Sequence, residues 1–254
     1  MRLFRSAPAK AKFRPLVERS VRIYVVGDIH GRLDLLEDLL DQIHKDEQAH
    51  QDDRSTQLVF LGDYVDRGDA SRGVLEELSK LRDTKHCPIV FLMGNHEEAM
   101  LRFLEDPVSE VGWLQYGGMQ TLASFGITTR LVKPKRADIA VMHQEFCTAI
   151  RPYLTFLNDL ALTHSSGDYF FCHAGVNPEK SLSQQSRRAL LWGHPLALAD
   201  QPIPAKRIVH GHYDDPVVSH KTGRICIDTG AYYSGILTAL RLDETEKLVQ
   251  TKGL

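Results

Sequence analysis

Within its first hundred residues the chain repeats one pattern three times, and no other feature limits the possible folds as strongly. A short apolar run is followed by glycine and then by aspartate or asparagine, and an amphipathic helical stretch comes next. The three loops read GDIHG (residues 27–31), GDYVDRG (residues 62–68) and GNHE (residues 94–97). Glycine lets the backbone turn sharply and approach a bound group closely. The pattern predicts three β–loop–α units whose parallel strands bring these loops to one edge of a sheet.

Further strands are expected in the second half of the chain. Two apolar runs, at residues 169–172 and 208–209, lead directly into histidine-containing sequences. Apolar and β-branched residues near the end predict a closing antiparallel set over residues 217–219, 225–228 and 236–242.

The length of 254 residues suits one domain with a small addition. Residues 1–20 are rich in arginine and lysine and are expected to form a flexible basic arm. Residues 21–254 are expected to form a single domain. Aromatic and glycine-rich sequence followed by an amphipathic stretch predicts a helical cap or insertion at about residues 105–160.

Charge and cysteine content narrow the function classes. A net charge of -2 gives no general attraction to nucleic acid or to a membrane surface, and no stretch is long enough to span a bilayer. The four cysteines are scattered and form no Cys-x-x-Cys pair, which favours reduced thiols and a cytoplasmic protein.

Polar side chains that can bind metal follow the predicted strands. Carboxylate, amide and imidazole groups together suit Mn, Fe or Zn better than Ca or Mg. One such residue alone is more often a helix cap or a packing residue, but equivalent positions in successive units favour a shared site. The set is too large for one open site, so two ions that share a carboxylate and hold a water between them are expected. Its members are Asp28, His30, Asp63, Asn95 and His173, with either His210 or His212.

These motifs, with HAG at residues 173–175 and GH at residues 211–212, resemble the signature of the phosphoprotein phosphatase family of metallophosphoesterases. The resemblance runs from about residue 24 to residue 242 and is greatest to the small bacterial serine/threonine phosphatases. It implies a four-layer α/β/β/α sandwich of two mixed sheets, the calcineurin-like metallophosphoesterase fold. It also implies two divalent transition metal ions, with Mn expected first and Fe or Zn as alternatives.

The resemblance further assigns metal ligands, and it selects His212 over His210. Asp28, His30 and Asp63 would hold one ion. Asp63 would bridge to a second ion, which Asn95, His173 and His212 would also hold.

By the same resemblance, His96 would protonate the leaving oxygen, Asp66 would orient His96, and Arg67 would bind phosphate oxygens, as a guanidinium fork can. Asn95 would also contact the substrate. Relatives commonly carry an arginine shortly after the tryptophan that corresponds to Trp192, whereas this chain has GHP at residues 193–195. We expect His194 to stand near the missing arginine and to contact the substrate phosphate.

Three functions remain open from the sequence. The first is hydrolysis of phosphoserine or phosphothreonine in proteins or peptides, by in-line attack of a hydroxide that bridges the two metals. The alternative is a dinucleoside polyphosphate hydrolase, acting for example on diadenosine tetraphosphate. Asp66 and Glu97 favour the phosphoprotein substrate. Relatives that cleave dinucleotides typically have another residue in place of Asp66 and an aspartate in place of Glu97. The third is a non-catalytic phosphate-binding or interaction protein, supported only by the missing arginine.

Overall fold

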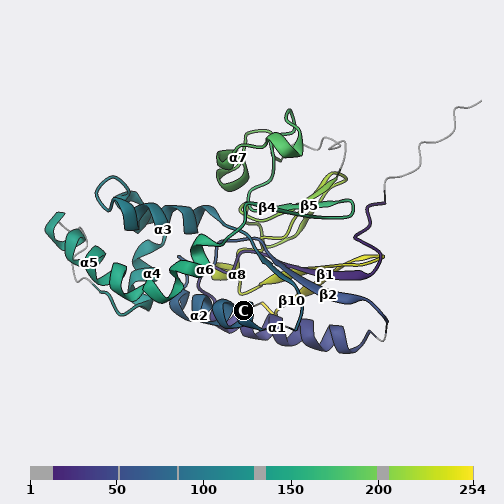
Figure 1. Cartoon of the computed structure of the whole chain (residues 1–254), viewed down its shortest axis with the longest axis horizontal. Helices are drawn as coiled ribbons and strands as arrows, with labels where there is room; N and C mark the ends of the chain where they lie inside the picture. Colours follow the sequence, from purple (N-terminus) through teal and green to yellow (C-terminus); the bar gives the residue numbers. More distant parts are fainter. Residues whose placement is uncertain (1–13, 51, 85, 129–135, 199–205, 254) are drawn as a thin grey trace, which may run out of the picture.

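Two five-stranded sheets form the centre of the molecule, and helices lie on their outer sides (Figure 1). This arrangement confirms the predicted four-layer sandwich of two mixed sheets. The computed structural model describes residues 14–50, 52–84, 86–128, 136–198 and 206–253.

The first sheet contains the strands of the three predicted units. Its order is β10-β9-β1-β2-β3, in which β1 to β3 run parallel and β9 and β10 are antiparallel neighbours. The bounds are β1 (Val21–Val26), β2 (Ser55–Phe60), β3 (Ile89–Phe91), β9 (Thr238–Leu242) and β10 (Glu246–Gln250). The carboxyl ends of β1, β2 and β3 therefore meet at one edge, as predicted.

The second sheet has the order β4-β5-β6-β8-β7, with a parallel centre and antiparallel edges. The bounds are β4 (Thr163–Ser166), β5 (Tyr169–Cys172), β6 (Arg207–His210), β7 (Ser219–His220) and β8 (Arg224–Cys226). The prediction of one closing antiparallel set was wrong. The strands β7 and β8 pair here, whereas β9 pairs with β1 in the first sheet.

Successive side chains of β1 point to opposite faces of the first sheet and so hold the layers together. Ile23 and Val25 belong to the apolar cluster between the two sheets, which also contains Phe171 and Val209 of the second sheet. Tyr24 and Val26 point the other way and pack in the cluster beneath the helices. One strand thus buries both of its faces, since successive side chains point to opposite sides.

The outer layers are helical. The helices α1 (Leu33–Gln48) and α2 (Ser71–Asp83) lie below the first sheet in Figure 1, and α7 (Arg187–Trp192) lies above the second. The buried face of α1 carries Leu36, Leu39 and Ile43 at helical spacing. On the other side, Leu190 of α7 packs with Phe170 and Ile208 of the second sheet.

The segment predicted as a helical cap contains several helices that gather beside the sheets in Figure 1. Trp113 packs against Phe103 and Phe146 there, and all three belong to the same apolar cluster as α1 and α2. The helices of this region are α3 (Asn95–Glu105), η1 (Val111–Tyr116), α4 (Gly118–Ser124), α5 (Arg136–Ala149), η2 (Arg151–Tyr153) and α6 (Leu154–Asn158). Two short helices follow later, η3 (Leu182–Gln184) and α8 (Ala231–Ser234).

Most of the predicted basic arm, residues 1–13, lies outside the described residues. Residues 14–20 lie against the turn between β4 and β5, where the Leu16 amide donates to the Asp168 carboxylate and Val17 is buried. This part is therefore held on the domain and is not a free arm. Within the described ranges, every helix is too short or too polar to cross a membrane.

Candidate metal centre and active site

The predicted site residues come from loops at the ends of five strands, and the fold brings them together. His30 follows β1, Asp63 follows β2, and Asn95 begins α3 after β3. From the second sheet, His173 follows β5 and His212 follows β6. The sandwich places the strand ends of both sheets around one volume, which is why residues so distant in sequence can form one cluster.

The backbone is strained at these positions. Five non-glycine residues in the described ranges have a left-handed φ between 47° and 73°. Such a conformation costs about 1–3 kcal/mol per residue and persists where the surroundings enforce it, commonly at functional sites. All five are predicted site residues: His30, Asp63, Asp66, Arg67 and His212.

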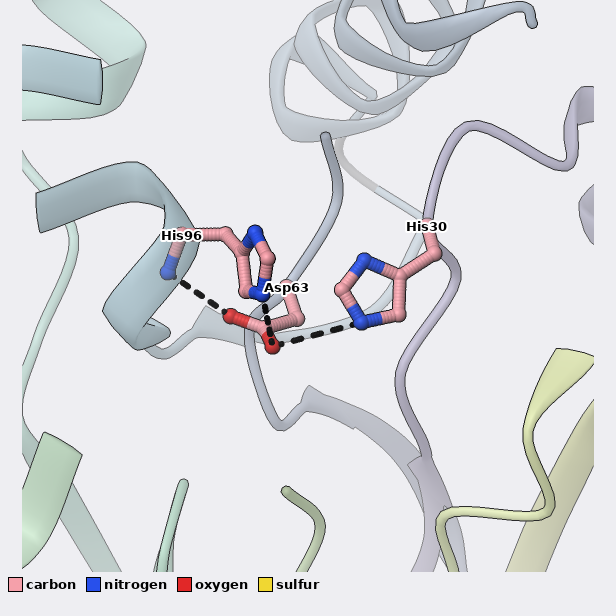
Figure 2. A group of neighbouring side chains, drawn as sticks. All are labelled: His30, Asp63 and His96. Atoms are coloured by element: carbon pink, nitrogen blue, oxygen red, sulfur yellow. Dashed lines mark hydrogen bonds and ion pairs between the residues drawn. The ribbon is translucent and has the colours of Figure 1, made fainter. Parts of the chain in front are cut away.

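Asp63 lies at the middle of the cluster, and each of its carboxylate oxygens faces a different group. Its Oδ2 is 3.4 Å from Nε2 of His30 and 3.9 Å from Nε2 of His96 (Figure 2). Its Oδ1 is 3.5 Å from Nε2 of His173. The structure therefore contains two overlapping sets of donor atoms that share this carboxylate, one with His30 and His96 and one with His173 and His212.

Asn95 joins the second set. Its Oδ1 is 2.8 Å from Nε2 of His173 and 2.9 Å from Nδ1 of His212. His210, the competing candidate, turns its Nδ1 to the Gly211 carbonyl and belongs to neither set within the described residues. The geometry thus agrees with the selection of His212.

Backbone carbonyls orient two of the imidazoles. Nδ1 of His30 is 2.9 Å from the Val65 oxygen, and Nδ1 of His173 is 3.0 Å from the Leu61 oxygen. Each Nδ1–H can donate there, which leaves Nε2 unprotonated toward the cluster. Burial lowers the pKa of His30 to about 3 and also lowers the pKa of His173. Both rings are therefore held in the neutral form that binds metals.

Asp28 supplies a direct test of whether a cation fits. Its Oδ2 accepts from the His212 amide at 3.0 Å, but its buried Oδ1 has no hydrogen-bond partner among the described residues. Burial, and then the nearby charges of Asp228 and Asp63, raise the pKa of Asp28 well above its usual value. A buried carboxylate oxygen without a partner is costly, and a cation would offset that cost. The donor set of oxygens and imidazole nitrogens fits transition metal ions.

His96 connects this cluster with a buried acid. Its Nδ1 is 2.7 Å from Oδ2 of Asp66, and its Nε2 faces the cluster. Asp66 is itself fixed by Trp113 Nε1 at 2.8 Å and by the Thr121 hydroxyl at 2.6 Å. Burial lowers the pKa of His96, but the charge of Asp63 and the bond to Asp66 outweigh it and raise that pKa to about 8. A histidine held this way can carry a proton at neutral pH.

Two supporting residues were not predicted from the sequence. Thr121 gave no signal, because nothing near it in the sequence marks it as a partner of Asp66. Glu97 was noted only as a family position. In the structure its buried carboxylate accepts from the amides of Gly94, Asp63 and Tyr64 at 2.7–2.9 Å. It therefore holds the strained loop in place, and its oxygens face the backbone and not the cluster.

Arg67 brings positive charge to the first set of ligands. Its Nη2 is 3.4 Å from Nε2 of His96, and its guanidinium lies 4.8 Å over the ring of Tyr232. His194, by contrast, makes its hydrogen bond within its own turn. Its Nδ1 accepts from the Leu196 amide in the turn after α7. Within the described part of the chain, no contact joins His194 to the His–Asp cluster, so its contact with the substrate stays a prediction.

Comparisons with known proteins agree with this geometry. The family model for calcineurin-like phosphoesterases matches residues 21–241. The bis(5'-nucleosyl)-tetraphosphatase PrpE [asymmetrical] of Oceanobacillus iheyensis is 30% identical over 249 residues, which cover 89% of this chain and 90% of the relative. The serine/threonine-protein phosphatase SIT4 of Candida albicans is 34% identical over 165 residues, 65% of this chain and 43% of that protein.

Among solved structures, a candidate diadenosine tetraphosphatase superimposes with a TM-score of 0.61 at 19% identity, covering 95% of this chain and 99% of the other. This last likeness concerns the fold. The family match extends over nearly the whole chain and includes every strand-end loop of the cluster. The chain therefore belongs to the calcineurin-like metallophosphoesterases, a family of hydrolases that use divalent metals.

Proposed function

We propose that this protein hydrolyses dinucleoside polyphosphates such as diadenosine tetraphosphate. The observation that carries the proposal is the match to the Oceanobacillus iheyensis bis(5'-nucleosyl)-tetraphosphatase, which extends over about nine tenths of both chains. The match to the protein phosphatase SIT4 covers less than half of that relative. The order of the two leading functions expected from the sequence is therefore reversed.

The surroundings of Glu97 weaken the sequence argument for a phosphoprotein substrate. Glu97 counted against a dinucleotide substrate as a family position, but its carboxylate accepts from four backbone amides and does not face the cluster. Asp66 is likewise completely buried behind His96. Glu97 therefore gives no direct contact that would distinguish the two substrates, and Asp66 acts only through His96.

In this proposal the cluster binds two metal ions, with the ligands expected from the sequence. Asp28, His30 and Asp63 would hold one, while Asp63, Asn95, His173 and His212 would hold the other. When bound, such ions polarise a phosphoryl oxygen and lower the pKa of water to supply a nucleophile. Their mixed oxygen and nitrogen ligands favour Mn, with Fe or Zn as alternatives.

The remaining steps use side chains of this chain. Arg67 binds non-bridging phosphate oxygens, held in place by the Tyr232 ring below its guanidinium. His96 donates its Nε2 proton to the leaving oxygen. Asp66 keeps the ring oriented through Nδ1 and stabilises its charged form. For a dinucleoside polyphosphate, the leaving group is a nucleoside phosphate.

Hydrolysis of phosphoserine or phosphothreonine remains the second candidate. It is favoured by the intact Asp66–His96 pair, because an alkoxide leaving group needs protonation more than a phosphate does. The partial match to SIT4 points the same way.

Turnover of the two substrate classes by one metal-loaded preparation separates these candidates. We expect kcat/KM for diadenosine tetraphosphate to exceed that for every peptide in a phosphoserine and phosphothreonine panel. Chromatography of the nucleotide products identifies which phosphate is attacked. Turnover of the peptides with none of the dinucleotide would contradict the proposal and restore the protein phosphatase function.

A further inference from the structure

A cavity of about 450 Å³ lies beside the metal ligands, between α7 and the loop that follows β6. Its walls combine aromatic and basic side chains, namely Trp192, Arg188, His194 and Tyr213. Apart from the phosphate contact expected of His194, none of these residues has a role in the steps described above. Tyr213, which lines the cavity, directly follows the metal-ligand candidate His212 in the chain.

Trp192 offers the cavity a fixed aromatic surface. The residue is 41% exposed although it is large and apolar. Its Nε1 donates to Oε2 of Glu98 at 2.5 Å, and Arg187 binds the other oxygen of the same carboxylate at 2.5 Å. Glu98 is buried and belongs to α3, the helix that begins with Asn95 and His96. The indole is therefore anchored to the catalytic helix while part of it remains open to a ligand.

Tyr213 connects this cavity with the metal ligands. Its ring lies edge-on to His212, with 4.9 Å between the ring centroids. Its hydroxyl lies against Gly193, where a Cβ atom would be only 2.0 Å from the oxygen. Gly193 also has a φ of 79°, which favours glycine. Gly193 thus leaves room for the Tyr213 hydroxyl, and Tyr213 contacts both a candidate metal ligand and the wall of the cavity.

We infer that this cavity binds one nucleoside of the substrate, with its base stacked on Trp192. The inference rests on the proposed function, since a dinucleoside polyphosphate carries a base beyond the cleaved phosphate. Any of the nucleic-acid bases can stack on an aromatic side chain, because every base has a π face. An indole that is already fixed and exposed loses little conformational freedom when the base binds. Arg188 supplies positive charge for the phosphates between the base and the cluster.

Replacing Trp192 by leucine tests the stacking, because leucine keeps apolar bulk without an aromatic face. We expect Trp192→Leu to raise KM for diadenosine tetraphosphate between about fivefold and 100-fold more than KM for p-nitrophenyl phosphate, which has no base. Trp192→Phe should recover most of the difference. Leu248→Ala is the matched control, because Leu248 is similarly exposed at 39% but lies on β10. It should change neither constant.

Fluorescence gives a readout that does not depend on turnover. The chain has two tryptophans, and Trp113 is buried. ADP added to the metal-loaded protein should quench the emission of Trp192, pyrophosphate should not, and the quenching should be lost in Trp192→Phe.

Equal changes in KM for both substrates, no quenching by ADP, or a selective effect on phosphopeptides would each overturn the subsite. Failure of the proposed function looks different, because the unaltered protein would then not cleave diadenosine tetraphosphate at all.

Discussion

Asp63→Asn is expected to lower kcat/KM on the order of 10³-fold or more and to reduce the bound metal. The substitution keeps the shape of the side chain but removes the charge that both ligand sets share. It also removes one of two equivalent oxygens, of which Oδ2 faces His30 and Oδ1 faces His173. The His96 amide can still donate to the remaining amide oxygen, as it now does to Oδ1. The loss should therefore come from metal binding and not from unfolding.

Asp83→Asn is the matched control for this variant. It removes a carboxylate that is 73% exposed near the end of α2. Metal content and activity should stay near those of the unaltered protein, and both variants should unfold at similar temperatures. An Asp63→Asn protein that keeps full activity would show that the shared carboxylate is not at the reaction centre.

His96→Asn is expected to lower kcat by roughly 10²–10⁴-fold, the contribution of a positioned general acid. Metal content should stay near normal, because His96 is proposed as the acid and the proposed ligands Asp28, His30 and Asp63 all remain. Asp66→Asn should cause a smaller loss, since it leaves the imidazole in place but removes the charge that supports its protonated form. His44→Asn, on the exposed face of α1, is the control and should have no effect.

The leaving group provides a sharper test of this role. A phenolate with a low pKa needs little protonation, so the loss in His96→Asn should shrink for p-nitrophenyl phosphate. An equal loss for good and poor leaving groups would mean that His96 does not protonate the leaving oxygen. A large fall in bound metal in this variant would instead assign His96 to the first ligand set, beside His30 and Asp63.

The strand-end loops could be predicted from the sequence because local signals and topology agree there. Glycine, a following Asp or Asn, and an apolar run before them mark each loop. Parallel pairing of β1, β2 and β3 then places them together. The strained backbone at Asp63, Asp66 and Arg67 is the structural counterpart of this signal.

Other parts of the fold could not be found this way, since their cause is not local. The strand β4 reads THSS and β10 reads EKLVQ, and both are polar edge strands without a clear apolar alternation. The pairing of β9 with β1 joins residues more than two hundred positions apart. Local patterns cannot choose between the two sheets for such a strand.

The contacts that support the site could not be predicted from the sequence either. Thr121 and Glu97 act through hydrogen bonds to Asp66 and to backbone amides, and such bonds leave no spacing in the sequence. The same kind of hidden contact affects how the two candidate substrate classes are weighed. Glu97 was weighed as a position that distinguishes substrates, whereas the structure shows it supporting the loop of Asp63.

Metal content measured alongside activity tests the central claim most directly. Protein stripped of metal and titrated with Mn²⁺ should regain hydrolysis of diadenosine tetraphosphate, with activity reaching its maximum near two bound ions per chain. That result follows from two ligand sets that share Asp63. Full activity in protein that holds no transition metal would contradict the account.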